Sequence, residues 1–151
     1  MSLFNGFNIS ASGLTANRMR MDVVSSNIAN ANTTRAQLVN GEWVPYRRKS
    51  VELSQSGVSP FQQQLQSVMN NQSTKISGVT VSKIDEDQAP FTLSFDPSHP
   101  DADENGYVRL PNVDPIKEMV DLMSATRSYE ANITALNASK NMFMKALEIG
   151  K

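Results

Sequence analysis

The chain has 151 residues, and its 14 lysines and arginines are balanced by 15 aspartates and glutamates to give a formal net charge of -1. This balance shows no basic excess, so nucleic acid is not an expected partner. The chain has no cysteine, which excludes disulfides, thiolate metal sites and thiol catalysis. The first residues resemble no secretory signal peptide, and no stretch is apolar enough to span a bilayer, so we expect neither a cleaved leader nor membrane insertion.

Residues 3–31 are predicted to form a long helix, because apolar side chains repeat every seven residues along it. Leu14, Met21 and Ile28 share one line, and Val24 belongs to a second. A seven-residue period places such side chains on one helix face and favours packing against other helices with a left-handed supercoil. Small residues are frequent here, and they lower helix stability while allowing a neighbouring backbone to come close.

The middle of the chain, residues 33–112, is expected to be rich in short strands and loops. Asn-Thr-Thr, Asn-Gly and Val-Pro steps within residues 32–46 indicate turns and loop. The glutamine- and serine-rich residues 54–74 are also interpreted as a loop, since such polar runs rarely support a core. Strand-like patterns occur in four runs, residues 51–53, 79–81, 91–95 and 107–110.

A second long helix is predicted at the other end of the chain. Asp114 can cap it, Pro115 suits its first position, and Gly150 lies beyond its end. Its main apolar heptad line consists of Leu122, Tyr129, Leu136 and Phe143. A companion line is expected at Met119, Thr126, Ile133 and Leu147.

These elements predict an α+β fold in which long N- and C-terminal helices form a coiled-coil-like pair and a small β-rich segment lies between them in the sequence. The expected division is an N-terminal assembly helix at 1–32, a middle segment at 33–112 and a C-terminal assembly helix at 113–151. A chain that is helical at both ends and offers no complete core at either is expected to assemble with other chains.

No residue pattern indicates an enzyme or a metal centre. His99 is the only histidine and lies in a predicted turn. Asp101 and Asp103 resemble the first half of a calcium-binding EF-hand loop, but Asn112 occupies the position of the required glutamate. A polar hairpin turn with Asn-Gly at its tip is the favoured interpretation of this loop, and calcium binding is kept as an alternative. The basic run at residues 47–49 is interpreted as a solvated surface, and contact with an acidic patch of a neighbouring protein is kept as a secondary alternative.

The run Ser-Asn-Ile-Ala-Asn at residues 26–30, followed by Asn-Thr at 32–33, resembles the N-terminal signature of the bacterial flagellar rod and hook family. Residues 118–137 are similar to the C-terminal signature of that family. Residues 96–113 and the ending 145–150 resemble its proximal basal-body rod subunit, which is short and lacks the large central domain of distal rod and hook proteins.

The resemblance implies a structural subunit of the proximal rod, which is part of the motor drive shaft. It implies partners among copies of the chain and other rod subunits, and export by the flagellar type III apparatus without a cleaved signal peptide into a rod in the periplasmic space. It implies no catalysis, cofactor, metal or small-molecule substrate. The residues expected to form the assembly interface are Leu14, Met21, Val24, Asn27, Ile28, Asn30, Met119, Leu122, Tyr129, Leu136 and Phe143.

Asn27 and Asn30 are expected to hydrogen-bond to backbone where the first helix ends. Alternative interpretations of the chain are a different rod subunit and a cytoplasmic helical binding or regulatory protein.

Overall fold

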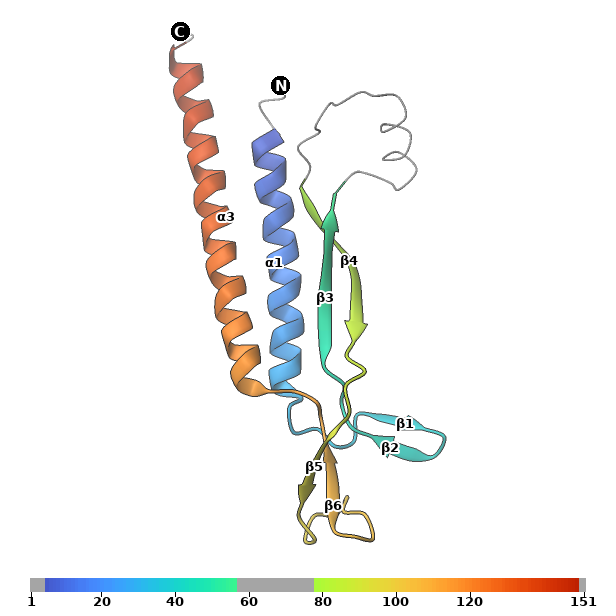
Figure 1. Ribbon diagram of the computed structural model, residues 1–151. Helices are drawn as coiled ribbons and strands as arrows, with labels where there is room; N and C mark the ends of the chain where they lie inside the picture. The colour runs from blue at the N-terminus through green and yellow to red at the C-terminus, as the bar shows by residue number, and fades with distance from the viewer. Residues whose placement is uncertain (1–4, 57–77, 150–151) are drawn as a thin grey trace. The chain divides into compact units, whose positions relative to one another are not determined.

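The computed structural model describes residues 5–56 and 78–149, and its elements are a helix, six short strands and a second helix (Figure 1). This order confirms the predicted α+β class. In chain order the elements are α1 (Asn5–Ala29), β1 (Gln37–Val39), β2 (Glu42–Val44), β3 (Lys49–Gln55), β4 (Val79–Glu86), β5 (Thr92–Phe95), β6 (Tyr107–Leu110) and α3 (Pro115–Ile149).

The described residues fall into two compact units, and each unit takes part of both helices. The first unit contains residues 5–19, 52–56, 78–83 and 126–149. The second unit contains residues 20–51 and 84–125. No described helix is both long enough and apolar enough to cross a membrane.

The helix α1 confirms the predicted N-terminal helix within the described residues. Ala16, Val23 and Val24 are buried, whereas Leu14 is half-buried. In the first unit, a Cβ atom added to Gly13 would lie 3.0 Å from Oδ1 of Asn132 in α3. Glycine therefore permits the close approach of the two helices that the small residues of this segment predicted.

The helix α3 begins with the predicted cap. The Asp114 carboxylate accepts hydrogen bonds from the backbone amides of Ile116, at 3.0 Å, and Lys117, at 3.4 Å. These bonds satisfy two of the amides that a helix start leaves without an intrahelical partner.

The two heptad lines predicted for α3 differ in how far they are buried within the chain. The main line of Leu122, Tyr129, Leu136 and Phe143 is half-buried, but the expected companions Met119, Thr126, Ile133 and Leu147 are all exposed. The line that lies deeper within the chain is Glu118, Ala125, Asn132 and Ser139, of which the first two have no exposed surface. An apolar pattern does not reveal this line, because it consists of small and polar residues whose polar groups are hydrogen-bonded.

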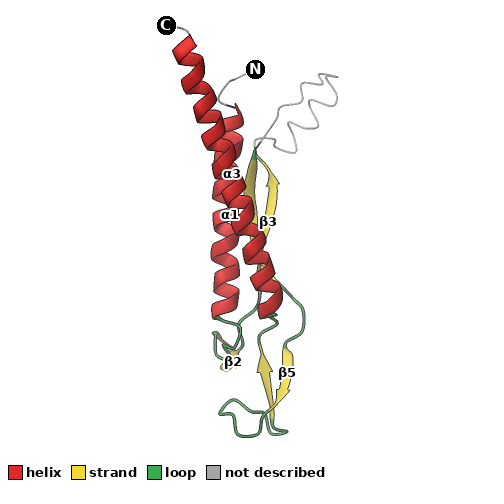
Figure 2. Ribbon diagram, turned by 90° about the vertical axis from the view of Figure 1, so that its left-hand side faces the viewer, coloured by secondary structure: helices red, strands yellow, loops and turns green. Residues whose placement is uncertain are grey.

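The strands of the described residues form three two-stranded sheets, β1–β2, β3–β4 and β5–β6 (Figure 1). Figure 2 shows β3 and β5 with their partner strands in yellow. The β1–β2 hairpin corrects the prediction of loop for residues 32–46. Val39 pairs with Glu42, and the two residues between them have positive φ angles, 54° at Asn40 and 90° at Gly41. This Asn-Gly pair has the left-handed backbone of a type I′ turn, which matches the twist of the flanking strands.

The other two sheets contain the four predicted strands. In the antiparallel β5–β6 pair, Phe95 lies opposite Tyr107. Residues 96–106 connect these strands, so Asn105 and Gly106 lie at the end of a longer loop and not at a two-residue tip. Of the glutamine-rich segment, residues 57–74 lie outside the described residues.

Candidate functional site

Asn27 is the centre of a buried polar cluster in the second unit. Its amide nitrogen donates to the backbone oxygen of Lys49 and to Oε2 of Glu118, both at 2.8 Å. Its amide oxygen accepts from the backbone nitrogen of Lys49 at 2.9 Å and from the hydroxyl of Tyr46 at 3.0 Å. A carboxamide has two donors and two acceptor positions, and all four are used here. This arrangement needs asparagine, because aspartate lacks the donors and leucine lacks both kinds of group.

Glu118 contributes to the cluster from α3, whereas Asn27 contributes from α1, and Glu118 has no exposed surface. Arg48 donates from Nε to its Oε1 at 2.6 Å, while Asn27 donates to its Oε2. The Arg48 guanidinium also lies 3.6 Å from the Asp121 carboxylate and 4.0 Å from that of Asp87. A buried carboxylate is tolerated only when it is paired and hydrogen-bonded, and both conditions are met.

A second asparagine, Asn30, hydrogen-bonds to residues on both sides of the end of α1. Asn30 donates from its amide to the backbone oxygen of Ser26 at 2.9 Å and accepts from the hydroxyl of Thr33 at 3.2 Å. The backbone amide of Tyr46 then donates to the carbonyl of Thr33 at 3.1 Å. The structure thus confirms that Asn27 and Asn30 hydrogen-bond to backbone groups near the helix end.

The basic run at residues 47–49 was expected to form a solvated surface, and for Arg48 this expectation is wrong. The Arg48 side chain forms an ion pair with Glu118. The Arg47 guanidinium stacks 4.5 Å from the ring centre of Phe91, and the Lys49 ammonium lies 5.8 Å from that of Tyr46. The run therefore binds acidic and aromatic groups of its own unit.

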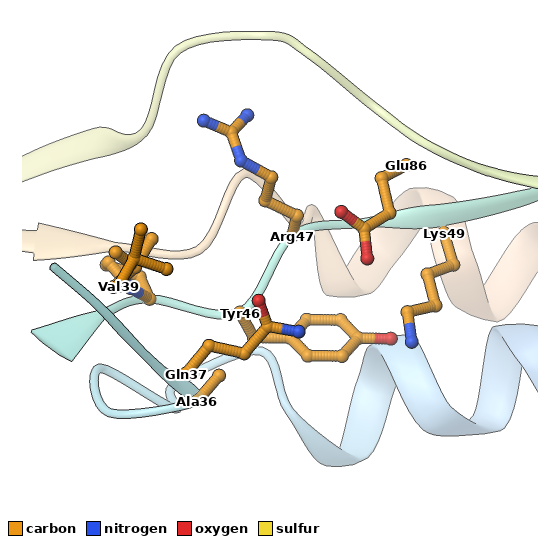
Figure 3. Close-up of a pocket in the computed structure, with 9 residues that line it drawn as sticks. Ala36, Gln37, Val39, Tyr46, Arg47, Lys49 and Glu86 are labelled. Atoms are coloured by element: carbon orange, nitrogen blue, oxygen red, sulfur yellow. The ribbon is translucent and has the colours of Figure 1, made fainter.

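A cavity of about 310 Å³ adjoins this run. Figure 3 shows Tyr46, Arg47 and Lys49 along it, together with Gln37 and Glu86. The other described lining residues are Ala36, Val39, Val44 and Pro45.

The loop that resembles half of an EF-hand is held by an ion pair. Asp101 accepts from Nε of Arg35 at 2.6 Å and from the hydroxyl of Thr34 at 2.7 Å. Both of its carboxylate oxygens are therefore occupied by groups of the same unit. Among the residues that the structure describes, no three histidine, aspartate or glutamate side chains are placed to hold a metal ion.

The Arg35 and Thr34 hydrogen bonds hold the pKa of Asp101 below its ordinary value of 3.8. The ion pair should therefore stabilise the fold fully above pH 3.8 and lose this contribution as the pH falls through the lowered pKa.

In an NMR titration of the carboxyl carbons, Arg35→Gln should raise the pKa of Asp101. Asp96 is the internal control, because bonds from Ser98 lower its pKa, and that pKa should not move. An unchanged Asp101 pKa would contradict the assigned pairing.

The residues expected to form the assembly interface occupy three environments. Val24 and Asn27 are buried, and Met119 is exposed. The others are half-buried, namely Leu14, Met21, Ile28, Asn30, Leu122, Tyr129, Leu136 and Phe143.

The ends of the chain match two family models. Residues 7–37 match the flagella basal body rod protein model, and residues 104–149 match the flagellar basal body rod FlgEFG protein C-terminal model. The whole chain is 62% identical to the flagellar basal-body rod protein FlgC of Bacillus subtilis, over all of both chains. It is 42% identical to the FlgC protein of Salmonella typhimurium over all of both chains, and 42% identical to that of Borreliella burgdorferi over 99% of this chain and 98% of that one. The chain belongs to the FlgC family of flagellar basal-body rod proteins.

The buried cluster joins the two segments that match the flagellar rod family models. Asn27 lies in the N-terminal match and Glu118 in the C-terminal one, and the two side chains share a 2.8 Å hydrogen bond. Sequence reasoning selected Asn27 but missed Glu118, Arg48 and Tyr46. The pairing of a glutamate with an arginine 70 residues away leaves no periodic signal in the sequence.

Proposed function

We propose that this structural subunit of the flagellar basal-body rod belongs to the proximal rod and polymerises through the outward faces of its terminal helices. Its partners in this proposal are copies of itself and other rod subunits. The observation that carries the proposal is an apolar stripe on α3 within the second unit. The stripe consists of Ile116, Met119, Val120 and Met123, whose side chains are between 49 and 70% exposed.

The four side chains of the α3 stripe lie on one helix face, because they are spaced by three, four and seven residues. The opposite face carries Glu118 and Ala125, which are fully buried within the unit. An amphipathic helix normally turns its apolar side inward, so a helix that buries a glutamate and exposes four large apolar residues is expected to bury the latter against another molecule. Two methionines suit this role, since their flexible side chains adapt to differing neighbours.

The other predicted interface residues have an indirect role in this proposal. Leu14 and Tyr129 lie half-buried in the first unit, where Gly13 and Asn132 bring the helices together. Such residues would fix the helix pair within each subunit, while Met119 contacts the neighbour. The segments 1–32 and 113–151 would then act as assembly helices, with 33–112 as the segment between them.

The proposal includes the route and the place of the subunit. We expect export by the flagellar type III apparatus without a cleaved signal, and a position in the rod where it crosses the periplasmic space. We expect no catalytic activity and no cofactor. The full-length similarity to flagellar basal-body rod proteins supports the place in the rod.

The test is complementation of a Bacillus subtilis strain that lacks its own FlgC protein. The double substitution Met119→Glu and Met123→Glu should abolish swimming in soft agar, because it places two charges on the proposed contact. The matched control is Ser124→Glu with Ser128→Glu, which adds the same charges at exposed positions on the same helix and should leave swimming intact. Circular dichroism should show equal helix content in both variants. Swimming at the unsubstituted rate with the methionine variant would contradict the proposal.

A further inference from the structure

The sequence contains three asparagine–glycine steps, at residues 5–6, 40–41 and 105–106. The first begins α1, whereas the other two lie in the second unit, one at the turn between β1 and β2 and one in the loop before β6. An asparagine followed by glycine is prone to lose its side-chain amide, because the glycine has no Cβ to hinder its nitrogen from approaching the asparagine side chain. The fold decides how readily the two steps of the second unit react.

The Asn40–Gly41 step lies at the exposed tip of the β1–β2 hairpin (Figure 1). A Cβ atom added to Gly41 would meet no atom within 4 Å apart from those of its chain neighbours, so nothing packs against the turn there. The closing hydrogen bond of a two-residue turn uses the amide of the fourth residue, Glu42, and leaves the Gly41 amide outside the ladder.

The β1–β2 hairpin is also the kind of element that opens easily. Each of its strands has three residues, and residues 37–43 are all exposed. Its sheet contains no other strand. An isolated two-stranded hairpin is marginal in water, so its turn should open at a small cost in free energy while the rest of the unit stays folded.

The asparagine–glycine step of the loop before β6 is held on both sides. The Gly106 amide donates to the backbone oxygen of Asp103 at 2.8 Å, and the Gly106 carbonyl accepts from the amide of Asp96 at 3.0 Å. A Cβ atom added to Gly106 would lie 3.1 Å from the Phe95 ring and 3.2 Å from the Pro97 ring. The glycine nitrogen of this step is therefore already bonded, and its peptide unit has little room to rotate.

We propose that Asn40 is a site of spontaneous deamidation in the folded chain, with the Gly41 amide nitrogen as the attacking group. This nitrogen loses its proton and forms a bond to Cγ of Asn40, the bond from Cγ to the side-chain nitrogen breaks, and ammonia leaves with the proton. Water then opens the cyclic imide at either of its two carbonyl carbons. The products are aspartate and isoaspartate, and no other reactant is needed.

The two products should affect the turn differently. Aspartate tolerates the left-handed backbone that Asn40 has, with its φ of 54°, so this product keeps the two-residue turn. Isoaspartate adds a methylene group to the main chain and changes the length of the loop that sets the strand register. Either product adds a negative charge two residues before Glu42.

Peptide mapping by mass spectrometry of the full-length chain tests the proposal, because trypsin separates the two steps. Asn40 is the only asparagine of the tryptic peptide 36–47, and Asn105 is the only one of the peptide 84–109. After incubation of the native chain at mildly alkaline pH, deamidation of 36–47 should be about tenfold faster than that of 84–109, since opening costs less at the hairpin tip than in the packed loop. In urea the two peptides should react at similar rates.

Two controls identify the reacting group. Asn40→Gln should abolish the reaction of peptide 36–47, because a glutamine would have to close a larger ring, and an enzyme that methylates isoaspartate should label this peptide only in the unsubstituted chain. Equal rates for the two peptides in the native chain would overturn the proposal. A difference of the same size in urea would also overturn it, because neighbouring residues and not the fold would then set the rates. Unchanged reaction of peptide 36–47 in Asn40→Gln would assign the reaction to Gln37 instead.

Discussion

Replacing Asn27 with aspartate should destabilise the second unit more than replacing it with alanine, although aspartate has almost the shape of asparagine. Alanine removes four hydrogen bonds, so Oε2 of the buried Glu118 and the backbone of Lys49 lose the partners that Asn27 provides, at a cost of about 2–4 kcal/mol. Aspartate also places a second carboxylate where the amide nitrogen lies 2.8 Å from Glu118. Two like charges in one buried site should bring the cost to about 5 kcal/mol.

Urea unfolding of the full chain, followed by circular dichroism, measures both free energies. Asn8→Asp is the matched control, because it makes the same change at an exposed position of α1 and should cost less than about 0.5 kcal/mol. If Asn27→Asp proved as stable as Asn27→Ala, the assigned orientation of the amide would be wrong.

The elements of this fold are predictable from the sequence where a local rule sets them. Asp114 and Pro115 define the start of α3, and heptad spacing identifies both helices. The β1–β2 hairpin was also open to prediction, because Asn40-Gly41 is the preferred sequence of a type I′ turn. Its strands of three residues are too short to give a clear alternating pattern, and the turn signals of residues 32–46 favour a loop.

The faces of these elements are harder to predict, because hydrophobicity indicates burial without saying in which molecule. Met119 and Phe95 follow apolar patterns but are exposed in this chain, whereas Glu118 is buried. In a subunit that we propose to polymerise, apolar positions are divided between its own core and contacts with neighbours. A polar residue can take a core position when another part of the chain satisfies it, as Arg48 does for Glu118.

The cluster around Asn27 also joins α1 to α3 within the second unit. Glu118 in α3 is reached by Asn27 from α1 and by Arg48 from the segment before β3. These contacts lie on the inner side of α3, opposite the stripe that contains Met119. A defect in the cluster would therefore displace the α3 stripe without altering any residue in it.

Replacing Glu118 with alanine should lower the free energy of unfolding by about 3–5 kcal/mol, because it leaves the Arg48 guanidinium half-buried beside an unpaired Asn27 donor. Arg48→Ala should cost a similar amount, since the buried carboxylate then keeps only its bond from Asn27. The double variant should cost less than the sum of the two, with a coupling energy of about 2–3 kcal/mol.

The exposed ion pair of Lys145 and Glu148 is the control for this cycle, because it has a similar geometry without burial. Its atoms lie 2.8 Å apart, close to the 2.6 Å of Arg48 and Glu118, but both side chains are largely exposed. The same cycle of alanine variants should give a coupling of less than about 0.5 kcal/mol there, because water screens the charges. Equal coupling energies in the two cycles would show that burial of Glu118 adds nothing to the pair. A larger coupling at Glu118, together with loss of swimming in Glu118→Ala, would show that assembly depends on the internal cluster as well as on the exposed α3 stripe.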